Sequence, residues 1–222
     1  MSRPISLFAA SLLAAAFAGS AWAAPRSLEY RVVHPTYGDI GTYTNLVERV
    51  GDDTEVTSDL RIAVRLLGIV VYRQEARRSE RWQGQRLVAF DGVTVTNGER
   101  LQVHGEAREG GFAVTTSAGT VMAPASVHPS NPWSAMVLDT DVMMSTRTGQ
   151  ILPVHVSGGE TKPVAIAGST LRLRQYEIDS DKRQFVWLDD SGTPIAFRTA
   201  EDGTLIDFIL LRRQEVAANG RG

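Results

Sequence analysis

Histidine and cysteine are the usual ligands of transition metals and frequent partners in nucleophilic catalysis. This sequence has no cysteine and four histidines, His34, His104, His128 and His155. No two of them stand two or four residues apart, the spacings that place two ligands on one face of a strand or a helix. We therefore predict no metal site and no cofactor.

One segment does combine the residue types of a nucleophilic triad. His128 lies between Ser126 and Ser130, and Asp139 follows it. A histidine oriented by a carboxylate can take the proton of a serine hydroxyl. The segment lacks the G-x-S-x-G motif that presents a serine nucleophile. We therefore assign no catalytic residue, and we keep an envelope hydrolase or isomerase that uses His128 with Asp139 as an alternative function.

Aromatic side chains suggest a different function, the binding of an apolar molecule. Tyr72, Trp82 and Trp133 lie on segments that we expect to border a concave surface. Aromatic rings commonly line sites of that kind. His128 is close to Trp133 in the sequence and shares its loop. We predict that these four residues contact a lipophilic ligand.

The elements that position these residues are predicted to be β-strands. Glycine-containing turn sequences recur at short intervals, and runs rich in Val, Ile, Thr, Phe and Tyr lie between them. Asn97-Gly98 is a strong hairpin signal, because both central residues of a type I′ turn need a positive φ. The spacing predicts one all-β domain over residues 24–212, built as a single strongly curved antiparallel sheet, either an open barrel or a spiral β-roll.

Residues 54–82 carry most of this prediction. From Val56 to Leu66 apolar and polar residues alternate strictly, as in a strand with one buried face. The alternation breaks at Gly68, where we predict a sharp bend that curves the sheet. Beyond the bend we expect a second long strand whose charged cluster forms a solvated face. That cluster consists of Arg73, Glu75, Arg77, Arg78, Glu80 and Arg81.

Residues 123–138 differ from the rest because prolines at 124, 129 and 132 preclude a central strand. We predict a long Pro-rich loop with a short helix over 132–137, lying over one opening of the sheet. Residues 213–222 are predicted to be a flexible tail. Between the loop and the tail we expect strands over 170–176, 184–188, 194–199 and 204–212.

Residues 1–23 are typical of a secretory signal peptide. Arg3 precedes an apolar run from Ile5 to Gly19, and Ala21-Trp22-Ala23 matches a small-x-small cleavage site. We therefore predict export to the periplasm and no transmembrane segment after cleavage. The formal net charge of −2 argues against nucleic acid as a partner. The oligomeric state is left open.

Three stretches carry a resemblance to a known family. They are RIAVRLLGIVVYRQEARRSERWQGQRLVAFDGVTVTNGERLQVHG, APASVHPSNPW and STRTGQ. In them the chain resembles an uncharacterised family of exported Gram-negative bacterial proteins, catalogued as a domain of unknown function. The resemblance implies a periplasmic location and a curled β-sheet, and it transfers no catalytic residue.

These observations favour a non-enzymatic periplasmic β-protein. A strongly curved sheet has a concave face, which suits a lipophilic small molecule or a segment of an envelope protein. Besides the hydrolase or isomerase, a purely structural envelope-integrity factor is a second alternative. It differs from the first reading in having an interior filled by its own side chains.

Overall fold

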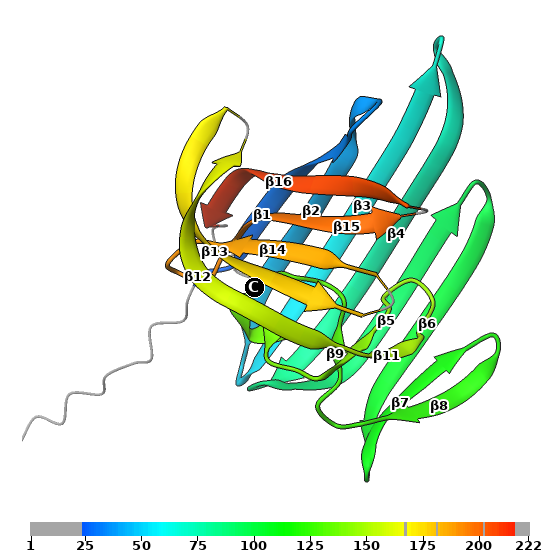
Figure 1. Cartoon of the computed structure of the whole chain (residues 1–222). Coiled ribbons are helices and arrows are strands. Elements are labelled where there is room, and N and C mark those ends of the chain that lie inside the picture. Colours follow the sequence, from blue (N-terminus) through cyan, green and yellow to red (C-terminus); the bar gives the residue numbers. More distant parts are fainter. Residues whose placement is uncertain (1–23, 167, 181, 202, 216–222) are drawn as a thin grey trace, which may run out of the picture.

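The computed structural model of the protein describes residues 24–166, 168–180, 182–201 and 203–215 (Figure 1). The predicted signal peptide lies outside these residues. The chain forms strands joined by short turns, with one 3-10 helix, η1. In chain order the elements are β1 Arg26–His34, β2 Gly38–Val50, β3 Asp53–Leu66, β4 Ile69–Gln83, β5 Arg86–Thr96, β6 Glu99–Arg108, β7 Gly111–Thr116, β8 Gly119–Ala123, β9 His128–Pro129, η1 Ala135–Leu138, β10 Val142–Met144, β11 Ile151–Pro153, β12 His155–Ile166, β13 Ser169–Asp179, β14 Gln184–Leu188, β15 Pro194–Glu201 and β16 Thr204–Glu215.

Thirteen of these strands make one antiparallel sheet in the order β12-β13-β14-β15-β16-β1-β2-β3-β4-β5-β6-β7-β8. Within the described residues its edge strands, β8 and β12, do not pair with each other, so the sheet is not closed. β1 lies inside the sheet and pairs with both β2 and β16, which joins the two ends of the chain. The predicted all-β class and single curved antiparallel sheet are confirmed.

Aromatic contacts show how strongly the sheet curves. Tyr43 on β2 and Phe197 on β15 are separated by two intervening strands, yet their ring centroids are 5.8 Å apart. In a flat sheet, three strand spacings would separate them by about 14 Å. The sheet therefore curls, and Figure 1 shows β13–β16 passing across β2–β5. The core lies on the concave side, where Leu28, Tyr30 and Phe90 are fully buried.

The turn around Gly68 corrects one prediction. Leu67 and Gly68 have φ values of 49° and 85°, so they form a two-residue turn that reverses the chain. The predicted second long strand is present as β4, but it pairs side by side with β3 as a hairpin, so the turn at Gly68 is not the predicted bend that curves the sheet. The alternation on both sides was interpreted correctly, but leucine is a poor signal for a positive φ. The Asn97-Gly98 turn is confirmed, with φ values of 50° and 93°.

The Pro-rich segment is largely buried. Val127 has no exposed surface, and Trp133 is nearly as buried. β9 lies within this segment, and β10 and β11, which follow it in the chain, complete a small second sheet. We expected a loop lying over an opening with a helix from Pro132, whereas the segment packs into the core and η1 begins at Ala135, with Ser134 as its N-cap. We call residues 124–154 the plug.

The four predicted strands of the second half are present as β13 to β16, all but β14 with wider bounds. β16 continues to Glu215 and pairs with β1, so residues 213–215 are strand rather than tail. The remainder of the predicted tail lies outside the described residues.

Candidate functional site

The curled sheet and the plug enclose a cavity of about 710 Å³. Its wall is apolar over β2, β3, β15 and β16, because the concave face of each strand carries every second residue. The apolar and aromatic part of the wall consists of Tyr37, Ile40, Tyr43, Leu60, Ile62, Val64, Val71, Tyr72, Pro132, Met143, Leu152, Val154, Phe197, Ile206 and Phe208.

The cavity wall also carries basic residues. They are His34, Arg78, Arg147 and Lys182. Neither aspartate nor glutamate occurs among the described residues that line it. A wall with an apolar part, basic groups and no carboxylate among its described residues favours a ligand that has an apolar body and a negative charge.

Arg78 is the most enclosed of these cations. Its exposed fraction is 8%, and its Nε has no hydrogen-bond partner. It forms no ion pair with any described residue. Burial lowers the pKa of the Arg78 guanidinium, with opposing effects from Tyr43 and Glu80, but an arginine stays charged in a protein. A buried charge without a partner costs several kcal/mol, so Arg78 has a positive charge that a ligand would neutralise.

The position of Arg78 and Glu80 corrects the predicted solvated face. Only part of the charged cluster points outward, because the side chains of β4 alternate between the two faces of the sheet. Arg78 and Glu80 lie on the concave face, together with Tyr72 and Trp82. Their even spacing from Tyr72 in the sequence is the signal that would have found them. Arg77, by contrast, lies on the convex face and pairs with Asp59 at 3.3 Å.

Glu80 forms the centre of a buried polar cluster next to the cavity. Its carboxylate accepts hydrogen bonds from Asn131 Nδ2 at 2.6 Å, Trp82 Nε1 at 2.9 Å and Trp133 Nε1 at 3.0 Å. Its exposed fraction is 2%, and burial raises the pKa of Glu80 to about 7. Asn131 and Trp133 belong to the plug, so this carboxylate fixes the plug to β4.

Asn131 extends the cluster to the neighbouring strands. Its Nδ2 also donates to Ser58 Oγ at 3.0 Å, and Ser58 in turn donates to Asn45 Oδ1 at 2.6 Å. Tyr43 donates its hydroxyl proton to Asn131 Oδ1. Burial raises the pKa of Tyr43 to about 12, which keeps that hydroxyl protonated at neutral pH. Side chains from β2, β3 and β4 thus hold the plug.

His128 is placed in this packed region rather than on the cavity wall. Its two ring nitrogens lie 3.4 Å from the Val137 carbonyl oxygen and 3.3 Å from that of Gln85. Its ring centroid is 5.0 Å from that of Trp82. Asp139 is exposed, follows η1 as its C-cap, and does not hydrogen-bond to His128. The geometry gives this pair a packing and capping role.

Of the four residues predicted to contact a ligand, Tyr72 lines the cavity. Trp82, His128 and Trp133 are buried and do not line it: the Trp82 ring contacts the rings of the other two, and both indoles donate to Glu80. Arg78 was missed because its neighbours in sequence are charged. Arg147 was missed because it lies in the irregular part of the plug, where no period reveals which residues face inward.

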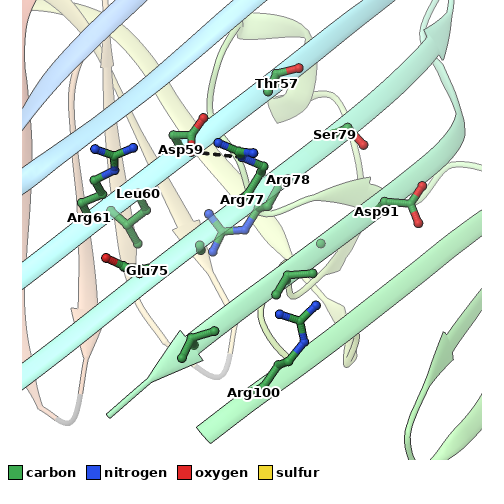
Figure 2. A pocket seen from close by; sticks show the side chains of 14 residues that line it. Thr57, Asp59, Leu60, Arg61, Glu75, Arg77, Arg78, Ser79, Asp91 and Arg100 are labelled. Carbon is green, nitrogen blue, oxygen red and sulfur yellow. Dashed lines mark hydrogen bonds and ion pairs between the residues drawn. The ribbon is translucent and has the colours of Figure 1, made fainter. Parts of the chain in front are cut away.

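A second depression, of about 610 Å³, lies on the convex face over β3 to β6 (Figure 2). Figure 2 shows both charges there: Arg61 and Arg77 are near Asp59 and Glu75, and the Asp59–Arg77 ion pair crosses from β3 to β4. Paired, exposed charges of this kind form an ordinary solvated surface.

The described residues also bear on metal binding and on helices that could cross a membrane. In the part of the chain that the structure describes, three or more His, Asp or Glu side chains are nowhere grouped as metal ligands would be. The described helical structure is confined to the four residues of η1, which is too short to cross a bilayer.

The titration of Glu80 predicts a pH-dependent stability. In the unfolded chain its carboxyl has a pKa near 4.5, and in the fold near 7. Between these values the folded state binds the extra proton, so the free energy of unfolding falls as the pH rises through this interval. We expect a fall on the order of 3 kcal/mol from this group. Urea unfolding at about pH 5 and about pH 8 measures it.

The matched variant for this titration is Glu80→Gln, which keeps the shape and removes the proton equilibrium. Its unfolding free energy should lose this part of the pH dependence. Equal slopes in the wild type and Glu80→Gln would show that Glu80 titrates normally in the fold.

The fold and the cavity define the class: a β-barrel-like protein with an open sheet, a plugged interior and a cavity whose wall is part apolar and part polar, with basic residues among the polar ones. The chain belongs to the family described as a domain of unknown function, DUF6134, which matches residues 30–211. No curated protein matches it.

This chain shares its fold with a solved structure. It is similar to a β-barrel-like protein of the domain of unknown function DUF1849 from Brucella abortus, with a TM-score of 0.65 and 10% identity, over 88% of this chain and 99% of that one. This likeness concerns the fold alone. A DUF1089 family protein from Pseudomonas aeruginosa has a TM-score of 0.31 and 15% identity, over 73% of this chain and 86% of that one. That likeness is too low to support an argument.

Proposed function

We propose that this protein is a non-enzymatic, periplasmic binding protein whose cavity holds a lipophilic molecule with an anionic end group. The single observation that carries the proposal is Arg78, a buried cation that lines the cavity beside its apolar wall and forms no ion pair with any described residue. The volume of about 710 Å³ falls within the range of small-molecule sites, roughly 300–1,000 Å³.

The ligand would lie with its apolar body against β2, β3, β15 and β16. Tyr72, Phe197 and Phe208 would contact that body, and Arg78 would face the anionic end. A guanidinium offers two parallel N–H donors to a carboxylate or phosphate, which fixes orientation as well as charge. Hydrocarbon burial would supply affinity at about 25 cal/mol per Å² of apolar surface.

Two further parts of the proposal rest on other observations. Periplasmic location is supported by the signal-like sequence of residues 1–23. Ligand binding is favoured over a purely structural role because the sheet and the plug leave a cavity of about 710 Å³ between them. An apolar segment of an envelope protein with an acidic residue would satisfy the same wall, and the ligand experiment separates it from a small molecule.

The test is a comparison of two ligands that differ only in charge. Lauric acid and lauryl alcohol would compete with an environment-sensitive fluorescent fatty acid for the purified protein. We expect the acid to bind about tenfold or more tightly than the alcohol, because only the acid neutralises Arg78. Native mass spectrometry of protein from the periplasm should show a co-purifying acidic lipid. Equal affinities, or no displacement by either compound, would contradict the proposal.

A further inference from the structure

The β3–β4 hairpin extends beyond the sheet as a free ribbon. Pairing of β3 with β2 stops at Ile62, and pairing of β4 with β5 begins at Gln74. Among the described residues, those from 63 to 72 therefore have strand partners only within the β3–β4 hairpin, whereas Arg73 also hydrogen-bonds to Asn97 in the β5–β6 turn. Figure 1 shows this hairpin, in turquoise, reaching further than the neighbouring turns. Isolated two-stranded ribbons have little stability of their own in water.

The end of the ribbon is apolar and exposed. Leu67 is fully exposed, Ile69 has an exposed fraction of 68%, and Val71 one of 50%. Leu66 and Val70 are also more than two-fifths exposed. Soluble proteins usually protect projecting strand edges with charged side chains or proline. These five large apolar residues are consecutive except for the turn glycine. An exposed apolar surface of this kind indicates a site that another surface covers when the protein functions.

The charges behind the tip are positive. Between Leu60 and Gln74 the sequence has three arginines, Arg61, Arg65 and Arg73, and no acidic residue. Arg73 is paired with Glu75 at 2.6 Å, whereas Arg65 is exposed and has no ion pair within the described chain. The apolar tip followed by arginines matches the layers of an anionic bilayer surface. The tip would reach the hydrocarbon, and the arginines behind it would lie at the level of the anionic head groups.

The ribbon stands at the mouth of the cavity. Val71 and Tyr72 from the ribbon line the cavity, as do His34 and Tyr37 from the β1–β2 turn at the same end of the sheet. Tyr37 has an exposed fraction of 45% and adds an aromatic residue of the kind that favours membrane interfaces. A surface that touches the tip would therefore lie beside the cavity opening.

We propose that the β3–β4 ribbon inserts shallowly into an anionic lipid surface through Leu66, Leu67, Ile69 and Val70, with Arg65 facing the head groups. Contact with that surface places the mouth of the cavity against lipid. The membrane contact stands independently of what the cavity holds. A second copy pairing along the free ribbon edge is the competing occupant, and it is distinguished by the experiment.

The experiment uses the mature chain and sedimentation with vesicles of phosphatidylcholine, with and without phosphatidylglycerol. We expect binding to the anionic vesicles, and about a tenfold or greater loss in the double variant Leu67→Ser/Ile69→Ser. Arg65→Gln should weaken binding to the anionic vesicles alone. The matched control is Val121→Ser/Met122→Ser, because these residues are also large, apolar and more than half exposed but lie on the distant edge strand β8.

Two further measurements test whether any loss of vesicle binding comes from the tip itself. Lauric acid affinity and circular dichroism of the tip variant should equal those of the wild type, which separates loss of membrane contact from loss of folding or of the cavity. In Leu67→Trp, brominated lipid should quench the emission of the new indole. The proposal is overturned if the wild type binds neither vesicle, if the tip variant binds like the wild type, or if the tip variant only dissociates a dimer in sedimentation velocity.

Discussion

Replacing Arg78 by Met is expected to weaken the binding of an anionic ligand by about 100-fold while stabilising the free protein. The loss follows from removing the charge that faces the ligand's end group, since a charge-assisted hydrogen bond in a dry site contributes about 1.5–3 kcal/mol. The gain follows from removing a buried cation that has no ion-pair partner. Apolar replacements of buried charges are often stabilising by about 1 kcal/mol or more.

The opposite signs of the two effects make this variant informative. Replacing a residue that only supports the fold would lower both stability and affinity. Replacing a binding residue that costs stability lowers affinity but raises stability. Displacement of a fluorescent fatty acid measures affinity, and urea unfolding measures stability. Affinity for lauryl alcohol should change little, because the alcohol carries no charge.

The control for Arg78 is its neighbour. Arg77→Met changes the same side chain on the convex face of β4, where Arg77 is exposed and pairs with Asp59 (Figure 2). This variant should leave both affinity and the urea midpoint close to the wild type. Loss of affinity in Arg77→Met equal to that in Arg78→Met would mean that net charge, rather than the cavity, controls binding.

Replacing Glu80 by Ala should destabilise the protein by about 3–5 kcal/mol, the largest stability change we expect from a single substitution. The change leaves Asn131 Nδ2 with one partner fewer and both Trp82 Nε1 and Trp133 Nε1 without an acceptor. Each buried donor that loses its partner costs about 1–3 kcal/mol. Because Asn131 and Trp133 belong to the plug, the plug should also loosen from β4.

Urea unfolding followed by tryptophan emission measures this effect directly, since two of the four tryptophans hydrogen-bond to the replaced carboxylate. Hydrogen exchange should increase first in residues 124–154. Glu75→Ala is the matched control on the convex face of the same strand, where the carboxylate is exposed and pairs with Arg73. A Glu80→Ala midpoint equal to that of Glu75→Ala would contradict the role given to the buried cluster.

Much of the local structure was determined by the sequence. The strict alternation from Val56 to Leu66 specifies a strand with one buried face, because side chains of a strand alternate between the two sides of a sheet. Asn97-Gly98 specifies a two-residue reversal through its backbone preferences. The prolines at 124, 129 and 132 specify that the plug is irregular. Each of these depends on interactions among near neighbours.

Only the tertiary structure decided where the functional groups meet. Glu80 and Asn131 are 51 residues apart, and Arg78 reaches the cavity because the sheet curls and the plug fills part of its interior. A two-residue period divides a strand into two faces, but it does not say which face a distant segment will cover. The charged residues at 78 and 80 suggested exposure to solvent, but both are buried by contacts that form only when the open sheet curls around the plug.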